Sequence, residues 1–124
     1  MRAILVDNLL FEDAEGIRRY VLQPHLGLIS LIAVLRSGGH EAELFDPKVE
    51  IAKGTLQLDD SLYREMARAI LRMKPDVVGM TSLGCNFICT VKVAEYLRRW
   101  APDLPILLKY DQASAYRLTC RAHQ

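Results

Sequence analysis

The sequence predicts an α/β fold in which a parallel sheet lies between two layers of helices. Short apolar runs alternate with longer segments of helical periodicity, and Gly or Pro separates most of them. The clearest run is Asp76 to Met80, which follows Pro75 and is too short for a helix. We predict that it forms a buried central strand. Ligands bind beyond the carboxyl ends of parallel strands, so the polar residues after this run are expected to line a crevice.

The first half of the chain adds one strand and one helix. Residues 2–6 are a short apolar run that ends at Asp7-Asn8, and residues 9–23 are expected to form a loop. A helix is predicted between Pro24 and Gly38-Gly39, because proline suits a first turn and glycine ends helices. One side of this helix is expected to face another domain or subunit, because its apolar residues cover nearly the whole circumference: Leu26, Leu28, Ile29, Leu31, Ile32, Val34 and Leu35.

Residues 40–46 alternate polar and apolar side chains, which is typical of a strand at the edge of a sheet. Residues 47–58 are expected to be a polar connection. An amphipathic helix then begins near Asp59-Asp60-Ser61 and ends at Lys74. The inward residues of this helix are predicted to be Leu62, Met66, Ile70 and Met73.

The last part of the chain predicts one more helix and one more strand. Asn86 is expected to cap the helix, and residues 105–108 predict a fourth strand buried on both faces. Residues 115–120 are a candidate fifth strand with no helix after it, so the domain is expected to be truncated after its fourth or fifth strand. The inward residues of the helix are predicted to be Phe87, Val91, Ala94 and Leu97.

Composition limits the function classes. A chain of 124 residues is expected to form one domain, and a formal net charge of +1 gives no reason to expect nucleic acid or an anionic membrane as partner. No run approaches the roughly 20 apolar residues of a membrane span, and nothing resembles a signal-peptide core. Three cysteines argue against a disulfide framework. We therefore expect a cytoplasmic protein that binds a small molecule or another protein.

The usual phosphate-binding and phosphorelay motifs are absent. No G-x-G-x-x-G follows the first strand, and there is no G-x-x-x-x-G-K-[ST]. A phosphorelay receiver would need an acceptor aspartate at the end of its middle strand, where this chain has Thr81-Ser82. Thr81, Ser82 and Asn86 have side chains that can hydrogen-bond a polar ligand tail. The alternative reading, strand exit and helix capping, remains open.

The cysteines do not predict a metal or iron–sulfur site. Cys85-x-x-x-Cys89 resembles the start of the C-x-x-x-C-x-x-C cluster motif of radical S-adenosylmethionine enzymes, but the third position is Lys92. Cys120 and His123 complete no standard zinc spacing with that pair. We therefore predict neither an iron–sulfur cluster nor a zinc site in this chain. For His25, a solvated residue in a first helical turn is the preferred reading.

Three segments together resemble the N-terminal cobalamin-binding domain of cobalamin-dependent radical S-adenosylmethionine (radical SAM) enzymes. That family includes methyltransferases and the anaerobic magnesium-protoporphyrin ester cyclases. The segments are 24–28 (PHLGL), 31–46 (LIAVLRSGGHEAELFD) and 74–83 (KPDVVGMTSL), and the resemblance covers about residues 2–108, with 109–124 as an atypical tail. It implies a flavodoxin-like (Rossmann-like) parallel sheet with strand order 2-1-3-4(-5).

The resemblance also implies a cofactor and its site. The nucleotide tail of cobalamin would lie at the carboxyl edge of the sheet, and Thr81-x-Leu83 resembles the S-x-L segment of cobalamin-dependent methionine synthases. Coordination of cobalt by His25 is a hypothesis only, because the D-x-H-x-x-G motif of those synthases is absent and the radical SAM family generally lacks this ligand. The implied cofactor-binding residues are Asp7, Asn8, His25, Gly27, Thr81, Ser82, Leu83, Gly84 and Asn86.

One departure from the family concerns the end of the fourth strand. The family has a Gly-Gly pair there, typically in G-G-P-H-A, where this chain has Lys109-Tyr110-Asp111-Gln112-Ala113. Glycine lets the backbone approach the nucleotide tail, so larger side chains at these positions are expected to narrow its groove.

Three functions are consistent with these observations. The first is a cobalamin-binding module that presents the corrin to a radical SAM domain or subunit, with a methyltransferase-like or related reaction carried out by that partner. No catalytic residue is assigned in this chain, and a radical SAM domain is not part of it. The second is a cofactor-free interaction or remnant domain that forms a homodimer through exposed apolar surface. The third is a binder of a small nucleotide or flavin at the same crevice.

Overall fold

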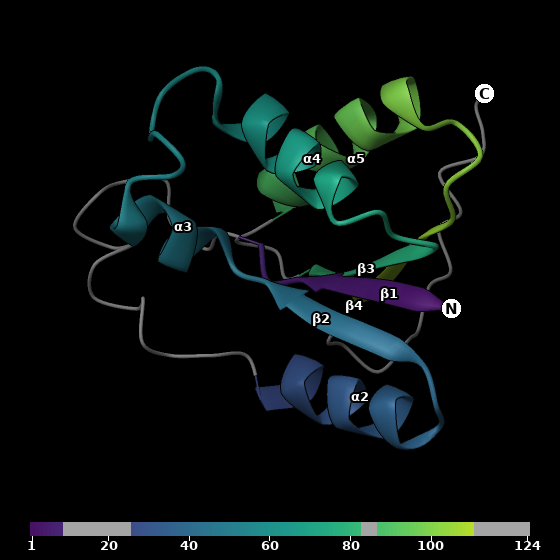
Figure 1. Ribbon diagram of the computed structural model, residues 1–124. Helices are drawn as coiled ribbons and strands as arrows, with labels where there is room; N and C mark the ends of the chain where they lie inside the picture. Colours follow the sequence, from purple (N-terminus) through teal and green to yellow (C-terminus); the bar gives the residue numbers. More distant parts are fainter. Residues whose placement is uncertain (9–25, 83–86, 111–124) are drawn as a thin grey trace.

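The computed structural model of the chain describes residues 1–8, 26–82 and 87–110. Four strands form one parallel sheet, and their order is β2-β1-β3-β4 (Figure 1). Their bounds are Arg2–Val6 for β1, Glu41–Phe45 for β2, Val77–Ser82 for β3 and Ile106–Tyr110 for β4. The predicted α/β fold with its flavodoxin-like strand order 2-1-3-4 is confirmed. The candidate fifth strand at 115–120 lies outside the described residues.

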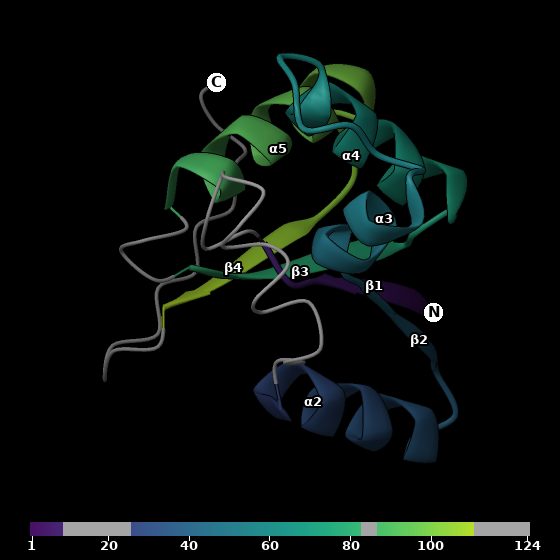
Figure 2. The same ribbon diagram turned by 90° about the vertical axis from the view of Figure 1, so that its left-hand side faces the viewer.

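Helices lie on both faces of the sheet (Figures 1 and 2). Helix α2, Leu26–Ser37, packs on the face that we call the lower face. The opposite, upper face is covered by α4, Leu62–Arg72, and α5, Phe87–Trp100. The short helix α3, Pro47–Lys53, follows β2 on the upper side. In the described part of the chain, no helix is long and apolar enough to cross a membrane.

Helix α2 packs on the sheet through one side only. Leu28 and Ile32 are buried against the small side chains of Ala3 and Ala42. Leu26 and Val34 are 74% and 66% exposed. The helix ends as predicted, because Gly39 adopts a φ of 86°, which only glycine adopts without strain. The outer side of this helix, which we expected to face another domain or subunit, is exposed in the single chain.

Helix α3 corrects the expectation of a polar connection at 47–58. A helix occupies 47–53 because its start and stop signals are both present in the sequence. The Asp46 side chain accepts a hydrogen bond from the Lys48 backbone N–H at 3.0 Å, and Pro47 occupies the first turn. Gly54, with a φ of 85°, ends the helix.

The upper core joins α4 and α5 to the strands. Leu62, Met66 and Ile70 of α4 face inward as predicted, with Met73 partly buried against them. The prediction for α5 was wrong at its first turns, since Phe87 is 47% exposed and Val91 is only partly buried. The buried residues of α5 are Cys89, Thr90, Val93, Ala94 and Leu97. Hydrophobicity ranks Phe87 above Cys89 and Thr90, but polar contacts described below turn the latter two inward.

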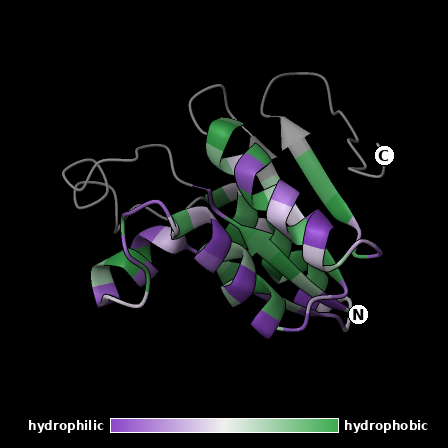
Figure 3. Cartoon of the chain, turned by 90° about the horizontal axis from the view of Figure 1, so that it is seen from above, coloured by the Kyte–Doolittle hydropathy of each residue, from purple (hydrophilic) through white to green (hydrophobic). Residues whose placement is uncertain are grey.

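Strand β4 was predicted to be buried on both faces, and the structure corrects this expectation. Ile106 and Leu108 are buried in the upper core, whereas Leu107, which points to the lower face, is 45% exposed. The strand is at the edge of the sheet, and no described helix lies beneath it (Figure 2). Seen from above, the sheet is mostly apolar and the outer sides of α4 and α5 are mostly polar (Figure 3). The upper face is therefore a closed core, whereas the described helices cover only half of the lower face.

Candidate functional site

The carboxyl ends of β1 and β3 lie side by side. Val6 is paired with Met80 in the register of the two strands, so Asp7 and Asn8 follow β1 at the edge where Thr81 and Ser82 end β3. From β1 the chain passes through α2 to β2 on one side, and from β2 it crosses through α4 to β3 on the other side. This change of direction is the topological switch point at which open α/β sheets bind ligands.

Asp7 is one member of a buried cluster at this edge. The Lys48 ammonium donates to Asp7 Oδ2 at 2.9 Å and lies 2.9 Å from Asp46 Oδ1. The side chains of all three residues are about nine-tenths buried, with 10%, 10% and 9% of Asp7, Asp46 and Lys48 exposed. Asp46 also caps α3, and the Asp7 backbone N–H donates to Phe45 O at 3.0 Å. The cluster therefore joins the ends of β1 and β2 to the start of α3.

The two carboxylates hold Lys48 in its charged form. Burial alone favours a neutral amine, but the hydrogen bonds from Lys48 to Asp46 and Asp7, together with their negative charges, outweigh burial and raise the pKa of Lys48 above its ordinary value. The cluster is thus a buried salt-bridge network of one lysine cation and two carboxylates. A charged lysine bonded to both acids is suited to orienting the chain rather than to transferring protons.

Asn8 connects the same edge to α5. It is fully buried, its Nδ2 donates to Thr90 Oγ1 at 2.9 Å, and its Oδ1 accepts from the Cys89 thiol at 3.5 Å. Buried polar side chains are stable only when they are hydrogen-bonded, so these contacts explain why α5 turns Cys89 and Thr90 toward the sheet. The amide of Asn8 is therefore hydrogen-bonded to α5 at the switch point.

The remaining predicted site residues are placed as follows. The backbone of Thr81 and Ser82 forms the end of β3, and Gly27 is exposed in the first turn of α2. His25, Leu83, Gly84 and Asn86 lie outside the described residues, as do Cys85, Cys120 and His123. Sequence reasoning missed Asp46 and Lys48. Asp46 carried a usable signal, because it follows a predicted strand directly and precedes proline. Lys48 carried none, since its burial depends on two residues from other elements.

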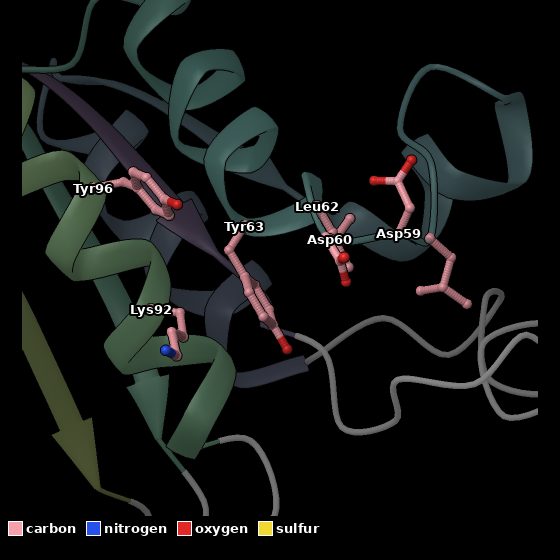
Figure 4. A pocket seen from close by; sticks show the side chains of 7 residues that line it. Asp59, Asp60, Leu62, Tyr63, Lys92 and Tyr96 are labelled. Carbon is pink, nitrogen blue, oxygen red and sulfur yellow. The ribbon is translucent and has the colours of Figure 1, made fainter.

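A separate hollow lies on the outer surface of the upper layer (Figure 4). It is a cleft of about 400 Å³ between the first turn of α4 and the middle of α5. The Asp59 carboxylate at its rim accepts from the Ser61 side chain and backbone, and these bonds lower the pKa of Asp59. Its lining includes none of the predicted site residues: Leu58, Asp59, Asp60, Leu62, Tyr63, Lys92 and Tyr96.

The described polar side chains at the switch point are therefore hydrogen-bonded to other residues of the protein. Asp7 and Asn8 lie at this edge, and both already have hydrogen-bond partners within the fold. Within the described ranges 1–8, 26–82 and 87–110, no three His, Cys, Asp or Glu side chains are grouped so that they could hold a metal ion. Comparison of the chain with protein-family models, with curated proteins and with solved structures gave no match.

Proposed function

We propose that this chain is a cobalamin-binding module that holds the nucleotide tail of the cofactor at the carboxyl edge, between β1 and β3. The observation that carries the proposal is the strand order β2-β1-β3-β4, which puts the predicted segments 7–8 and 81–82 at one switch point. The three sequence segments that resemble radical SAM cobalamin domains support the same site. When bound, cobalamin would supply a cobalt centre for chemistry completed by a partner domain.

The segments at this edge would have different roles in binding the cofactor. Asp7 and Asn8 would lie beneath the tail without hydrogen-bonding it, because Asp7 Oδ2 accepts from Lys48 and Asn8 Nδ2 donates to Thr90. The segment from Thr81 to Gly84 is proposed to contact the tail, since it leaves β3 at the same edge. The role of this chain is then to bind and orient the cofactor, and no catalytic step is assigned to its own side chains.

A titration with hydroxocobalamin, followed by visible absorption, tests the proposal. We expect a saturable spectral change that requires the folded protein. Ser82→Val should weaken binding about tenfold, which corresponds to one or two lost hydrogen bonds. Ser37→Val is the matched control, because Ser37 is exposed at the far end of α2 and bonds only within its own helix. A flat titration with the wild-type chain, or equal effects of the two substitutions, would contradict the proposal.

The end of β4 offers a gain-of-function test. Lys109 and Tyr110 stand where the resembled family has two glycines. If side chains at these positions narrow the groove, the double substitution to glycine should lower the Kd for hydroxocobalamin. An unchanged Kd would mean that they do not obstruct it. Flavin mononucleotide is titrated in parallel, because saturable binding of it alone would favour the flavin or nucleotide alternative.

A second candidate function is a cofactor-free interaction domain. The observation that favours it is the outer side of α2, where Leu26, Leu31 and Val34 are exposed. A helix at the surface of a monomer is normally polar on its outer side. This candidate and cobalamin binding use different parts of the molecule, so the two can also be combined.

A further inference from the structure

The cleft between α4 and α5 is large enough for a small ligand. It measures about 400 Å³, which falls within the roughly 300 to 1,000 Å³ of typical small-molecule sites. None of the described residues that line it belongs to β1 or β3, whose ends form the switch point. A ligand in this cleft would therefore be bound by other residues than those proposed for cobalamin. We call this hollow the α4–α5 cleft.

Two tyrosines that line the α4–α5 cleft are held in place by the protein itself. Tyr63 and Tyr96 are half-buried, because both pack against the upper core. The ring of Tyr96 also contacts Trp100, with ring centroids 5.3 Å apart, and the Arg99 guanidinium lies 5.4 Å from its centroid. Aromatic rings held in this way lose little side-chain freedom when a ligand binds, so they favour contact with an apolar group.

The α4–α5 cleft also carries charges of both signs. Asp59 and Asp60 lie on one side of Tyr63, and Lys92 lies on the other (Figure 4). In the described part of the chain, neither Asp60 nor Lys92 forms an ion pair. Asp59 accepts from Ser61 through Oδ1 only, and these bonds lower the pKa of Asp59, so its carboxylate is ionised at neutral pH. Two carboxylates at one end and one ammonium at the other are thus available to a ligand.

This distribution of charge restricts the chemistry of a ligand. The two carboxylates repel a phosphate or another anion, and Lys92 repels a polyamine. An amino acid carries its ammonium and its carboxylate on the same carbon atom, whereas the charges of the cleft lie on opposite sides of the Tyr63 side chain (Figure 4). A ligand that matches the whole cleft has an ammonium at one end, a carboxylate at the other and an apolar part between them.

We propose that the α4–α5 cleft binds a short peptide with free termini. The peptide ammonium lies against Asp59 and Asp60, its carboxylate lies against Lys92, and an apolar side chain packs on Tyr63 and Tyr96. Each charged group of the cleft then faces an opposite charge, and the tyrosine rings exclude water from the apolar contact. This activity goes beyond the proposed binding of cobalamin and does not require it.

The test is a titration of the full chain with the tripeptide Ala-Phe-Ala, followed by the backbone amide shifts in two-dimensional NMR spectra. We expect saturable shifts at residues 59–63 and 92–96, with a Kd on the order of 1 mM. N-acetylation removes the ammonium of the peptide, and C-terminal amidation removes its carboxylate. Each modification should raise the Kd about threefold, because ion pairs that are open to solvent contribute modestly.

Two substitutions link each end of the peptide to its partner in the cleft. Lys92→Met should raise the Kd of the free tripeptide about threefold and leave the Kd of the amidated form unchanged. Asp60→Asn should raise the Kd of the free tripeptide about twofold, because Asp59 remains, and leave the Kd of the N-acetylated form unchanged. Glu95→Gln is the matched control: Glu95 is exposed on α5 but does not line the cleft, so all three affinities should stay the same.

Three results would overturn the proposal. The first is the absence of saturable shifts in the cleft at peptide concentrations about tenfold above the expected Kd. The second is equal affinity for the free, acetylated and amidated tripeptides, which would show that the charges are not recognised. The third is binding of free phenylalanine as tight as that of the tripeptide, which would show that the separation of the charges has no effect. None of these results affects the cobalamin titration, so the two proposals fail separately.

Discussion

The upper and lower faces of this sheet are covered by helices of different character. On the upper face, α4 and α5 bury one side each, and buried hydrogen bonds fix the position of α5. The outer side of α4 is polar, whereas α5 also exposes Phe87 and Ile88 in its first turn. On the lower face, α2 is held by apolar contacts with small residues, and its outer side is apolar too. Within the described residues, the upper face is therefore complete, whereas the lower face lacks a helical cover for half of its width.

This difference concerns how the β1 exit, where a ligand is proposed to bind, is attached to the rest of the molecule. Two buried polar contacts join the β1 exit to the upper layer: Asp7 to Lys48 at the start of α3, and Asn8 to Thr90 in α5. The edge proposed to receive a ligand is thus joined to the upper core by buried polar contacts. The exposed outer side of α2, which favours the interaction-domain candidate, lies on the lower face, away from those contacts.

The strongest test of the comparison is a matched pair of core substitutions. Ile70→Ala removes a fully buried side chain from the upper core and should cost about 4 kcal/mol of unfolding free energy. Ile32→Ala, at the half-covered lower face, should cost about 2 kcal/mol, because solvent and neighbouring groups can occupy the space more easily. Urea denaturation measures both at a protein concentration where the chain is monomeric. Equal costs would show that the two faces are equally well packed.

Loss of the buried salt bridges of Lys48 should have the next largest effect on the free energy of unfolding. Lys48→Met leaves Asp7 and Asp46 buried together without their cation and should cost about 3 kcal/mol at neutral pH. Lys53→Met is the control, since Lys53 is exposed and its pair with Glu50 is a surface contact expected to contribute under about 0.5 kcal/mol. A cost for Lys48→Met no larger than that of the control would show that the cluster does not stabilise the β1 exit.

The pH dependence of that cost follows from the raised pKa of Lys48. A raised pKa means that the lysine contributes fully below 10.5, its ordinary value, and that this contribution is lost as pH rises through the folded-state pKa. The difference between the wild type and Lys48→Met should therefore be constant from neutral pH to about 10 and shrink above it. Urea denaturation of both proteins across this pH range measures it, and a difference that falls already between pH 7 and about 9 would contradict the assignment.

The smallest effect on the free energy of unfolding is expected when the hydrogen bond between Asn8 and α5 is removed. Thr90→Val keeps the shape of the side chain but removes the hydroxyl that accepts from Asn8, so it should cost about 1.5 kcal/mol. Thr55→Val is the control, because the Thr55 hydroxyl bonds an exposed carbonyl of Glu50, and its loss should cost under about 0.5 kcal/mol. If both substitutions cost the same, the buried bond contributes no more than a surface one.

Sequence patterns predicted most of the fold, including the shared edge at which β1 and β3 end, and the errors have a common cause. The central strand, the edge position of β2 and the inward residues of α4 follow from local apolar periodicity. The exposed Leu107 and the rotated start of α5 do not, because each depends on what lies beside it in space: β4 has no described helix beneath it, and α5 packs on Asn8. The helix at 47–53 could have been predicted from Asp46, Pro47 and Gly54.

What the sequence determined by itself is the parallel α/β fold and which residues follow each strand, because periodicity and glycine or proline positions act over a few neighbouring residues. Only the tertiary structure decided that Asp7 and Asn8 are bonded within the protein, that Lys48 completes a buried ion group, and that the described helices leave Leu107 of β4 exposed on the lower face. These properties arise between distant segments: Lys48 and Asp7 are 41 residues apart, and Asn8 and Thr90 are 82 apart. No local pattern records such contacts.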